Sequence, residues 1–167
     1  MFTTVAGFLK TWKFESEGTQ KLLAVLTDES LARAVTPEGR TLGRLAWHIT
    51  TTIPEMMERT GLHLGGTPHD APVPSSAHAI AAVYRELAAS LAKVVEESWT
   101  DATLALEDDM YGEKWTRGVT LGCLVGHQTH HRGQMTVLMR QAGLRVPGIF
   151  GPAREDWAQM GMAPPAI

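Results

Sequence analysis

The segment Gly126-His127-Gln128-Thr129-His130-His131-Arg132-Gly133-Gln134 holds three of the seven histidines of this 167-residue chain within five consecutive positions. Apolar residues recur on both sides of it, across residues 119–142, at the spacing of an α-helix. Residues four apart lie above one another on a helix, so His127 and His131 can direct both imidazoles at one point. Two ligands of a single metal ion require this arrangement.

A second pair, His127 and His130, competes with the first because residues three apart are also neighbours on a helix. The apolar positions distinguish the two pairs, since a helix advances by about 100° per residue. Measured from His127, Leu124 lies at about 60° and Leu138 at about 20°. His131 falls inside this apolar arc at about 40°, whereas His130 falls outside it at about −60°. We therefore predict that His127 and His131 point into the protein and that His130 does not.

Two polar residues, Gln128 and Arg132, interrupt the far side of the same arc. A helix with a second buried face, for example one packed against another subunit, would account for both residues.

Length and composition indicate a globular protein. A chain of 167 residues is typical of one domain with a substantial core, so we predict a single domain spanning residues 1–167. Apolar residues make up 44% and charged residues 20%, which is typical of a folded rather than a disordered chain. The net charge of −3 argues against a nucleic-acid-binding surface, which is basic.

The sequence also argues against a membrane protein or a secreted one. It contains no apolar run of about 18 residues, so no membrane span is predicted. Residues 1–7 lack the charged start and apolar core of a signal peptide. The single cysteine, Cys123, excludes an internal disulfide and is typical of a reducing compartment. We therefore expect a cytoplasmic protein.

Apolar periodicity predicts four helices, at about residues 2–27, 42–62, 76–97 and 118–142. Thr41 is the expected N-cap of the second, either Ser75 or Ser76 that of the third, and Gly143 the C-cap of the fourth. Pro54 should kink the second helix, because it cannot donate to the carbonyl of Thr50.

Two further segments lack a clear helical period. Residues 99–117 indicate a long loop with extended pieces, and residues 153–160 are expected to add one short helix. Four amphipathic helices without a convincing sheet predict an all-α protein, most simply a four-helix bundle.

A protein metal site needs a third ligand, and His48 is the first candidate. It lies beside Leu45 and Ile49 on the apolar side of the second predicted helix, and facing helices of a bundle can direct side chains to one interior point. The other histidines, His63, His69 and His78, lie in or beside a loop rich in Gly and Pro and are expected to be solvated.

A site of three imidazoles leaves at least one position for water or substrate, which is the pattern of catalytic rather than structural zinc sites. Neutral imidazoles favour zinc, nickel, copper or iron over magnesium or calcium. The ion would lower the pKa of a bound water or thiol.

Several other side chains have both a functional and a structural interpretation. Glu55, two turns beyond His48, is a candidate hydrogen-bond acceptor or general base, or a solvated carboxylate. Gln134 either hydrogen-bonds near the metal or packs. Arg132 either binds a substrate carboxylate or is an exposed or interface arginine. Cys123 is either a fourth ligand or, as we expect, a small buried residue.

Trp12, Trp47, Trp99 and Trp115 are interpreted as core residues.

Three stretches resemble the DinB/YfiT-like family of bacterial metal-binding four-helix bundles. They are the run from His127 to Gln134, the tail Gly143-Leu144-Arg145-Val146-Pro147-Gly148-Ile149-Phe150-Gly151-Pro152, and Leu42-Gly43-Arg44-Leu45-Ala46-Trp47-His48-Ile49, which matches the second-helix histidine of that family. The resemblance spans nearly the whole chain and is strongest from Trp115 to Asp156.

The resemblance implies a bundle with a long crossover between helices 2 and 3, often paired as a homodimer. It also implies a divalent metal, nickel or zinc, at the positions of His48, His127 and His131. Characterised members include bacillithiol S-transferases and mycothiol-dependent maleylpyruvate isomerase, so a low-molecular-weight thiol is an expected co-substrate.

The first functional hypothesis is therefore a metal-dependent enzyme acting on a small molecule, either a thiol S-transferase or isomerase or a hydrolase. The alternative is a non-catalytic metal-binding stress-response protein in which the ion ties helix 2 to helix 4.

Overall fold

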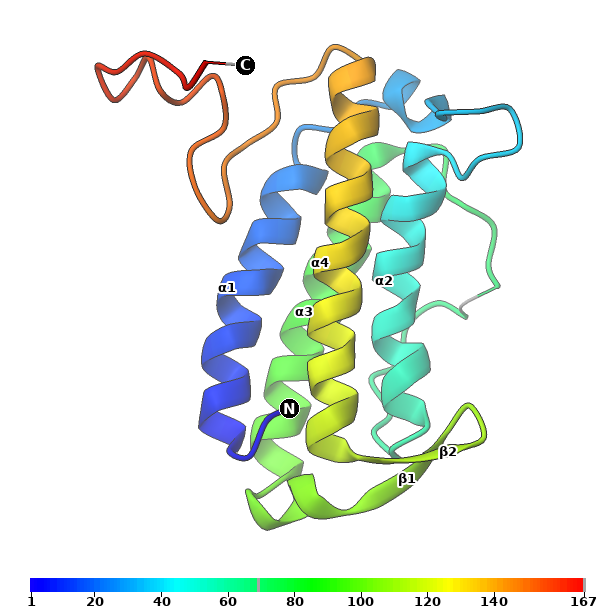
Figure 1. The fold of residues 1–167 in the computed structure, drawn as a ribbon. Coiled ribbons are helices and arrows are strands. Elements are labelled where there is room, and N and C mark those ends of the chain that lie inside the picture. Colours follow the sequence, from blue (N-terminus) through cyan, green and yellow to red (C-terminus); the bar gives the residue numbers. More distant parts are fainter. Residues whose placement is uncertain (69, 167) are drawn as a thin grey trace.

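The computed structural model describes residues 1–68 and 70–166, in which four long helices are present. Figure 1 shows them packed side by side, with a short hairpin at one end. The helices are α1 (Val5–Leu23), α2 (Leu42–Glu58), α3 (Ala77–Ser98) and α4 (Arg117–Gln141). Shorter elements are the 3-10 helices η1 (Glu29–Ala32) and η2 (Ala102–Ala105) and the strands β1 (Glu107–Met110) and β2 (Glu113–Thr116). The predicted all-α four-helix bundle is confirmed.

The order of the helices around the bundle places α4 beside both α1 and α2. Both α1 and α2 pack against α3 and against α4. In Figure 1 α2 and α3 run in the same direction, so the segment of residues 59–76 must cross back along the length of the bundle. This is the predicted long crossover between helices 2 and 3, and it brings α2 against α4.

The predicted N-caps are confirmed, and the C-cap of α4 is Ala142, one residue before the predicted Gly143. The Thr41 hydroxyl accepts the N–H of Arg44, and the Ser76 hydroxyl accepts that of Ala79. Each hydroxyl satisfies one of the backbone donors that a helix start leaves unpaired. Gly143 follows α4 with φ of 75°, a left-handed conformation that favours glycine.

Of the two predictions for the irregular segments, the structure confirms the one for residues 99–117 and contradicts the one for residues 153–160. The extended pieces predicted within residues 99–117 are β1 and β2, which pair antiparallel with Met110 opposite Glu113. The short helix predicted at residues 153–160 is wrong, because this segment forms successive turns. Its backbone bonds mostly join residues three apart, such as Asp156 N–H to the carbonyl of Ala153, so an α-helical ladder does not form.

The second buried face of α4 packs inside the same chain. Gln128 is 0% exposed; its amide nitrogen donates to the carbonyl of Ile49 at 2.6 Å, and its Oε1 accepts from the Tyr84 hydroxyl at 3.2 Å. Arg132 is 3% exposed and pairs with Glu15 of α1. Internal packing against α1, α2 and α3 therefore accounts for both polar residues, and the expectation that a subunit covers them is wrong.

No helix in the described part of the chain is both long enough and apolar enough to cross a membrane.

Candidate metal centre

Three imidazoles meet between α2 and α4. His48 Nε2 lies 3.1 Å from His127 Nε2, and His131 Nε2 lies 3.1 Å from the same atom. Their ligand nitrogens all lie within 4.8 Å of one another. The tertiary structure thus brings together the three histidines proposed from sequence, two from adjacent turns of α4 and one from the facing helix.

Burial keeps these imidazoles neutral. It lowers the pKa of His48 to about 4, with a further contribution from the neighbouring His127 and His131. Burial, followed by the charge of His131, lowers the pKa of His127 to about 4 as well. The pKa of His131 is also lowered, first by burial. Near pH 7 the three rings therefore carry lone pairs rather than positive charge, as metal ligands must.

Gln134 selects the tautomer of His131. Its Oε1 lies 2.6 Å from Nδ1 of the imidazole, and an amide oxygen can only accept. The proton of neutral His131 must therefore be on Nδ1, which leaves the lone pair of Nε2 directed at the other two rings. Of the two sequence-based roles for Gln134, the hydrogen bond near the candidate site is the one observed.

The geometry fits a divalent ion. Nitrogens held at roughly 2.0–2.1 Å from one ion, at tetrahedral or octahedral angles, are about 2.9–3.4 Å apart. The two separations that involve His127 Nε2, 3.1 Å each, fall within that range, and all three nitrogens lie within 4.8 Å of one another. Three neutral imidazoles offering lone pairs to one point repel one another unless a cation or a proton lies between them. His127 Nδ1 is buried without a hydrogen-bond partner among the described residues, so no neighbour holds its ring as Gln134 holds that of His131.

His130 lies outside this group, as the apolar arc predicts. It is exposed, and its ring stands 4.8 Å from the ring of His131 without joining the converging nitrogens. His63 and His78 are exposed too, in agreement with the expectation. His69 lies outside the described residues.

A cavity of about 420 Å³ opens on two of the histidines. Its polar lining includes Glu55, whose Oε2 accepts from the Tyr111 hydroxyl at 2.8 Å and whose Oε1 accepts from Arg59 Nε at 2.9 Å. Glu55 is therefore a fixed carboxylate facing the site rather than a freely solvated one. The cavity is lined by His48, Thr52, Glu55, Met56, Tyr111, Trp115, Cys123 and His127.

Sequence reasoning missed Tyr111 and Arg59. Tyr111 lies at the tip of the β1–β2 hairpin with φ of 60°, followed by Gly112 with φ of 88°. Such a pair of left-handed residues forms the tight turn that joins antiparallel strands, so Tyr-Gly between two extended pieces was the available signal. Arg59 stacks over the Tyr111 ring at 4.2 Å and bonds Glu55, and in this way the hairpin is attached to α2.

Two cavity residues are less buried than the sequence indicates. Cys123 is exposed and lines the cavity, so its interpretation as a small buried residue is wrong. It is not among the converging ligand atoms. Trp115 is only half-buried, unlike the core residues Trp12, Trp47 and Trp99, because it lies on the hairpin that closes the cavity.

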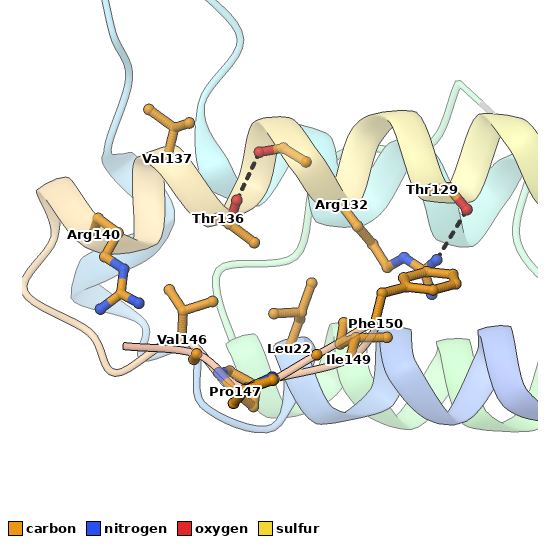
Figure 2. A pocket seen from close by; sticks show the side chains of 15 residues that line it. Leu22, Thr129, Arg132, Thr136, Val137, Arg140, Val146, Pro147, Ile149 and Phe150 are labelled. Atoms are coloured by element: carbon orange, nitrogen blue, oxygen red, sulfur yellow. Dashed lines mark hydrogen bonds between the residues drawn. The ribbon is translucent and has the colours of Figure 1, made fainter. Parts of the chain in front are cut away.

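Arg132 does not face the histidines and instead contacts α1 and the C-terminal tail. Its guanidinium donates to the carboxylate and the carbonyl of Glu15 and to the Thr129 hydroxyl. Figure 2 shows it directed toward the C-terminal tail, with Phe150 beside it. Arg132 is therefore not the exposed arginine that one sequence interpretation expected, and it is not among the residues that line the cavity at the histidines.

The fold and site define a class of protein: a four-helix bundle with a crossover between helices 2 and 3 and a three-histidine group compatible with a divalent metal between helices 2 and 4. The chain belongs to the DinB family, whose model matches residues 1–164.

Individual relatives agree with this assignment. The Bacillus subtilis (strain 168) protein YrdA, itself uncharacterized, is 47% identical over 167 residues, which span all of both chains. A crystal structure of a DinB-like protein from Bacillus cereus ATCC 10987 matches 90% of this chain and all of its own, with a TM-score of 0.87 and 49% identity. The DinB-like protein YjoA of Bacillus subtilis shares the fold, with a TM-score of 0.68 at 15% identity over 86% of this chain and 97% of that one.

Proposed function

We propose that this protein is a divalent-metal-dependent enzyme that acts on a small electrophilic substrate. It would use a low-molecular-weight thiol, as a thiol S-transferase or a thiol-dependent isomerase, or water in place of the thiol, as a hydrolase. The observation that carries the proposal is the convergence of three neutral imidazoles, two of which line a cavity. The ion, nickel or zinc, would lower the pKa of a thiol or water bound to it.

The residues of the chain then have separate roles. His48, His127 and His131 hold the ion, and Gln134 orients His131. Met56 and Trp115 provide an apolar wall for the substrate and exclude water from part of the cavity.

Glu55 is the candidate proton acceptor. Tyr111 and Arg59 each bond one of its oxygens, and every carboxylate oxygen has a further lone pair free to accept a proton from an incoming thiol or water. The family resemblance favours the thiol over water as the nucleophile.

The alternative is a non-catalytic metal-binding protein. It is supported by the origin of the ligands, because one comes from α2 and two from α4 and an ion would tie these helices together. The open cavity beside the ligands favours the enzyme, since a structural site needs no space for a substrate.

Replacement of single histidines tests the proposal. His131→Ala should abolish tight zinc or nickel binding and thiol transfer to an electrophile panel, while the fold survives on its apolar core. The matched control is His130→Ala, which removes an adjacent exposed histidine and should leave both unchanged. Metal content by mass spectrometry and turnover are measured on the same samples.

Thermal unfolding with and without a chelator separates the two functions. A small fall in melting temperature on chelation, together with metal-dependent turnover, supports the enzyme. A large fall without turnover of any thiol or ester would favour the structural alternative, because metal-binding energy would then be folding energy.

A further inference from the structure

A second cavity, of about 380 Å³, lies on the Gln134 side of the histidines. The loop before α2, the first turn of α2 and the C-terminal half of α4 form it. Most of its wall is aliphatic, and two polar side chains, Arg40 and Gln134, lie among these residues. The lining includes Val35, Arg40, Leu45, Gln134, Val137 and Leu138.

Arg40 is available to bind a ligand. No carboxylate of the described residues lies within 4.0 Å of its guanidinium, whereas Arg59, Arg117, Arg132, Arg140 and Arg145 all have such a partner. Two backbone hydrogen bonds hold the loop that carries Arg40. Leu42 N–H donates to the carbonyl of Arg33 at 2.8 Å, and within this loop Gly39 N–H donates to the carbonyl of Thr36 at 3.0 Å.

The amide oxygen of Gln134 is hydrogen-bonded to His131, whereas its amide nitrogen has no hydrogen-bond partner among the described residues. Its amide oxygen accepts from His131 Nδ1, so its amide nitrogen is the group left to meet the cavity. No hydrogen bond joins that nitrogen to any residue that the structure describes. The cavity opens to solvent, and it offers a guanidinium and an amide N–H₂ that have no acceptor among the described residues. Aliphatic side chains lie beside these groups: Leu45 and Leu138 are buried, whereas Val35 and Val137 are exposed.

We propose that this cavity binds a small organic acid, with its carboxylate against Arg40 and the amide nitrogen of Gln134 and its hydrocarbon part against Leu45, Val137 and Leu138. A guanidinium binds a carboxylate strongly and in a defined orientation. One guanidinium balances the single charge of a carboxylate, whereas a phosphate dianion would retain an unpaired charge. Apolar walls with a few placed polar groups are typical of small-molecule sites.

The carboxylate site is coupled to the histidines through Gln134. A ligand that accepts from the amide nitrogen fixes the amide oxygen on His131, which favours the tautomer that a metal requires. Carboxylate and metal should therefore change each other's affinity by the same factor. This coupling rests on the proposed function, whereas carboxylate binding by itself does not.

The experiment is a calorimetric titration of the chelated protein with hexanoate at low salt, beside hexanamide and inorganic phosphate. The metal is removed with a chelator beforehand, so hexanoate cannot bind to a metal ion instead of to Arg40. Arg40→Gln should weaken hexanoate binding about tenfold, as expected for one lost charge-assisted hydrogen bond. Arg44→Gln is the matched control, because it removes a neighbouring positive charge that does not line this cavity. Hexanamide and phosphate should bind far more weakly than hexanoate.

Three outcomes would overturn the proposal: no saturable hexanoate binding, equal binding of hexanamide, or an equal loss in the Arg40 and Arg44 variants. The last result would mean that only the general positive potential attracts the anion. Repeating the titration with zinc-loaded protein measures the coupling. A protein that binds hexanoate through Arg40 but binds no zinc would refute the proposed function and leave the carboxylate site standing.

Discussion

A single hydrogen bond, from His131 Nδ1 to the side-chain oxygen of Gln134, orients one ligand of the candidate metal centre. The Gln134 oxygen lies 2.6 Å from His131 Nδ1 and determines which nitrogen of that ring faces His48 and His127. Outer hydrogen bonds of this kind change metal affinity by about 10–100-fold in known sites.

We therefore predict that Gln134→Ala weakens zinc binding by about 10–100-fold without altering the fold. Gln134→Glu keeps an acceptor and should retain most of the affinity. Competition with a colorimetric chelator measures both variants, and circular dichroism checks the fold. Equal affinity of wild type and Gln134→Ala would show that His131 needs no partner to adopt its metal-binding tautomer.

At the scale of elements, α1 and α4 are joined by a buried ion pair. The Arg132 and Glu15 side chains are only 4% and 7% exposed, so removal of one partner leaves a buried charge without compensation. Arg132→Ala should destabilise the protein by about 3–5 kcal/mol. Denaturant unfolding provides the measurement, and metal affinity should not change, because Arg132 bonds α1 rather than the histidines.

Arg140→Ala is the control for this prediction. Arg140 is on the same helix and pairs with Glu155, but it is 40% exposed, and an ion pair at the surface contributes much less than a buried one. A loss of stability no larger for Arg132→Ala than for Arg140→Ala would contradict the assignment of the buried pair as the main polar link between α1 and α4.

At the scale of the whole molecule, the histidine group makes stability depend on pH. Burial lowers the pKa of His48 and His127 from 6.5 to about 4, so between these values the unfolded chain binds more protons than the folded one. The stability that comes from keeping the rings neutral is present above pH 6.5 and is lost as the pH falls toward 4.

Chelated protein should therefore melt at progressively lower temperature between about pH 6.5 and pH 4. Carboxylates also titrate in this range, so the comparison is with a His48→Asn, His127→Asn variant, whose melting temperature should fall less steeply. Parallel curves for the two proteins would mean that burial does not hold the rings neutral.

Assembly is also a property of the whole molecule, and the homodimer stays a prediction. One of its two supports is lost, because Gln128 and Arg132 are buried within the chain. The remaining support is the family resemblance. Light scattering at micromolar concentration measures the mass, and a monomer mass would contradict the prediction.

The sequence by itself determined the helices, their caps and the three converging histidines. Each follows from a local rule: the apolar period of about 3.6 residues, the hydroxyl that accepts a free N–H, and the shared face of residues four apart. Even the exclusion of His130 follows from its angle on the helix. The third histidine, His48, could be predicted from sequence because it lies on the apolar side of another helix.

Only the tertiary structure decided which groups surround those histidines. Glu55, Tyr111 and Trp115 meet because the hairpin folds over α2. Gln128 and Arg132 are buried because α4 packs against α1 and α2 and because Tyr84 of α3 reaches Gln128. A local pattern specifies which face a side chain occupies, but the partner of that face depends on contacts between residues far apart in the chain. Arg132 and Glu15, 117 positions apart, form such a contact, and no local periodicity contains it.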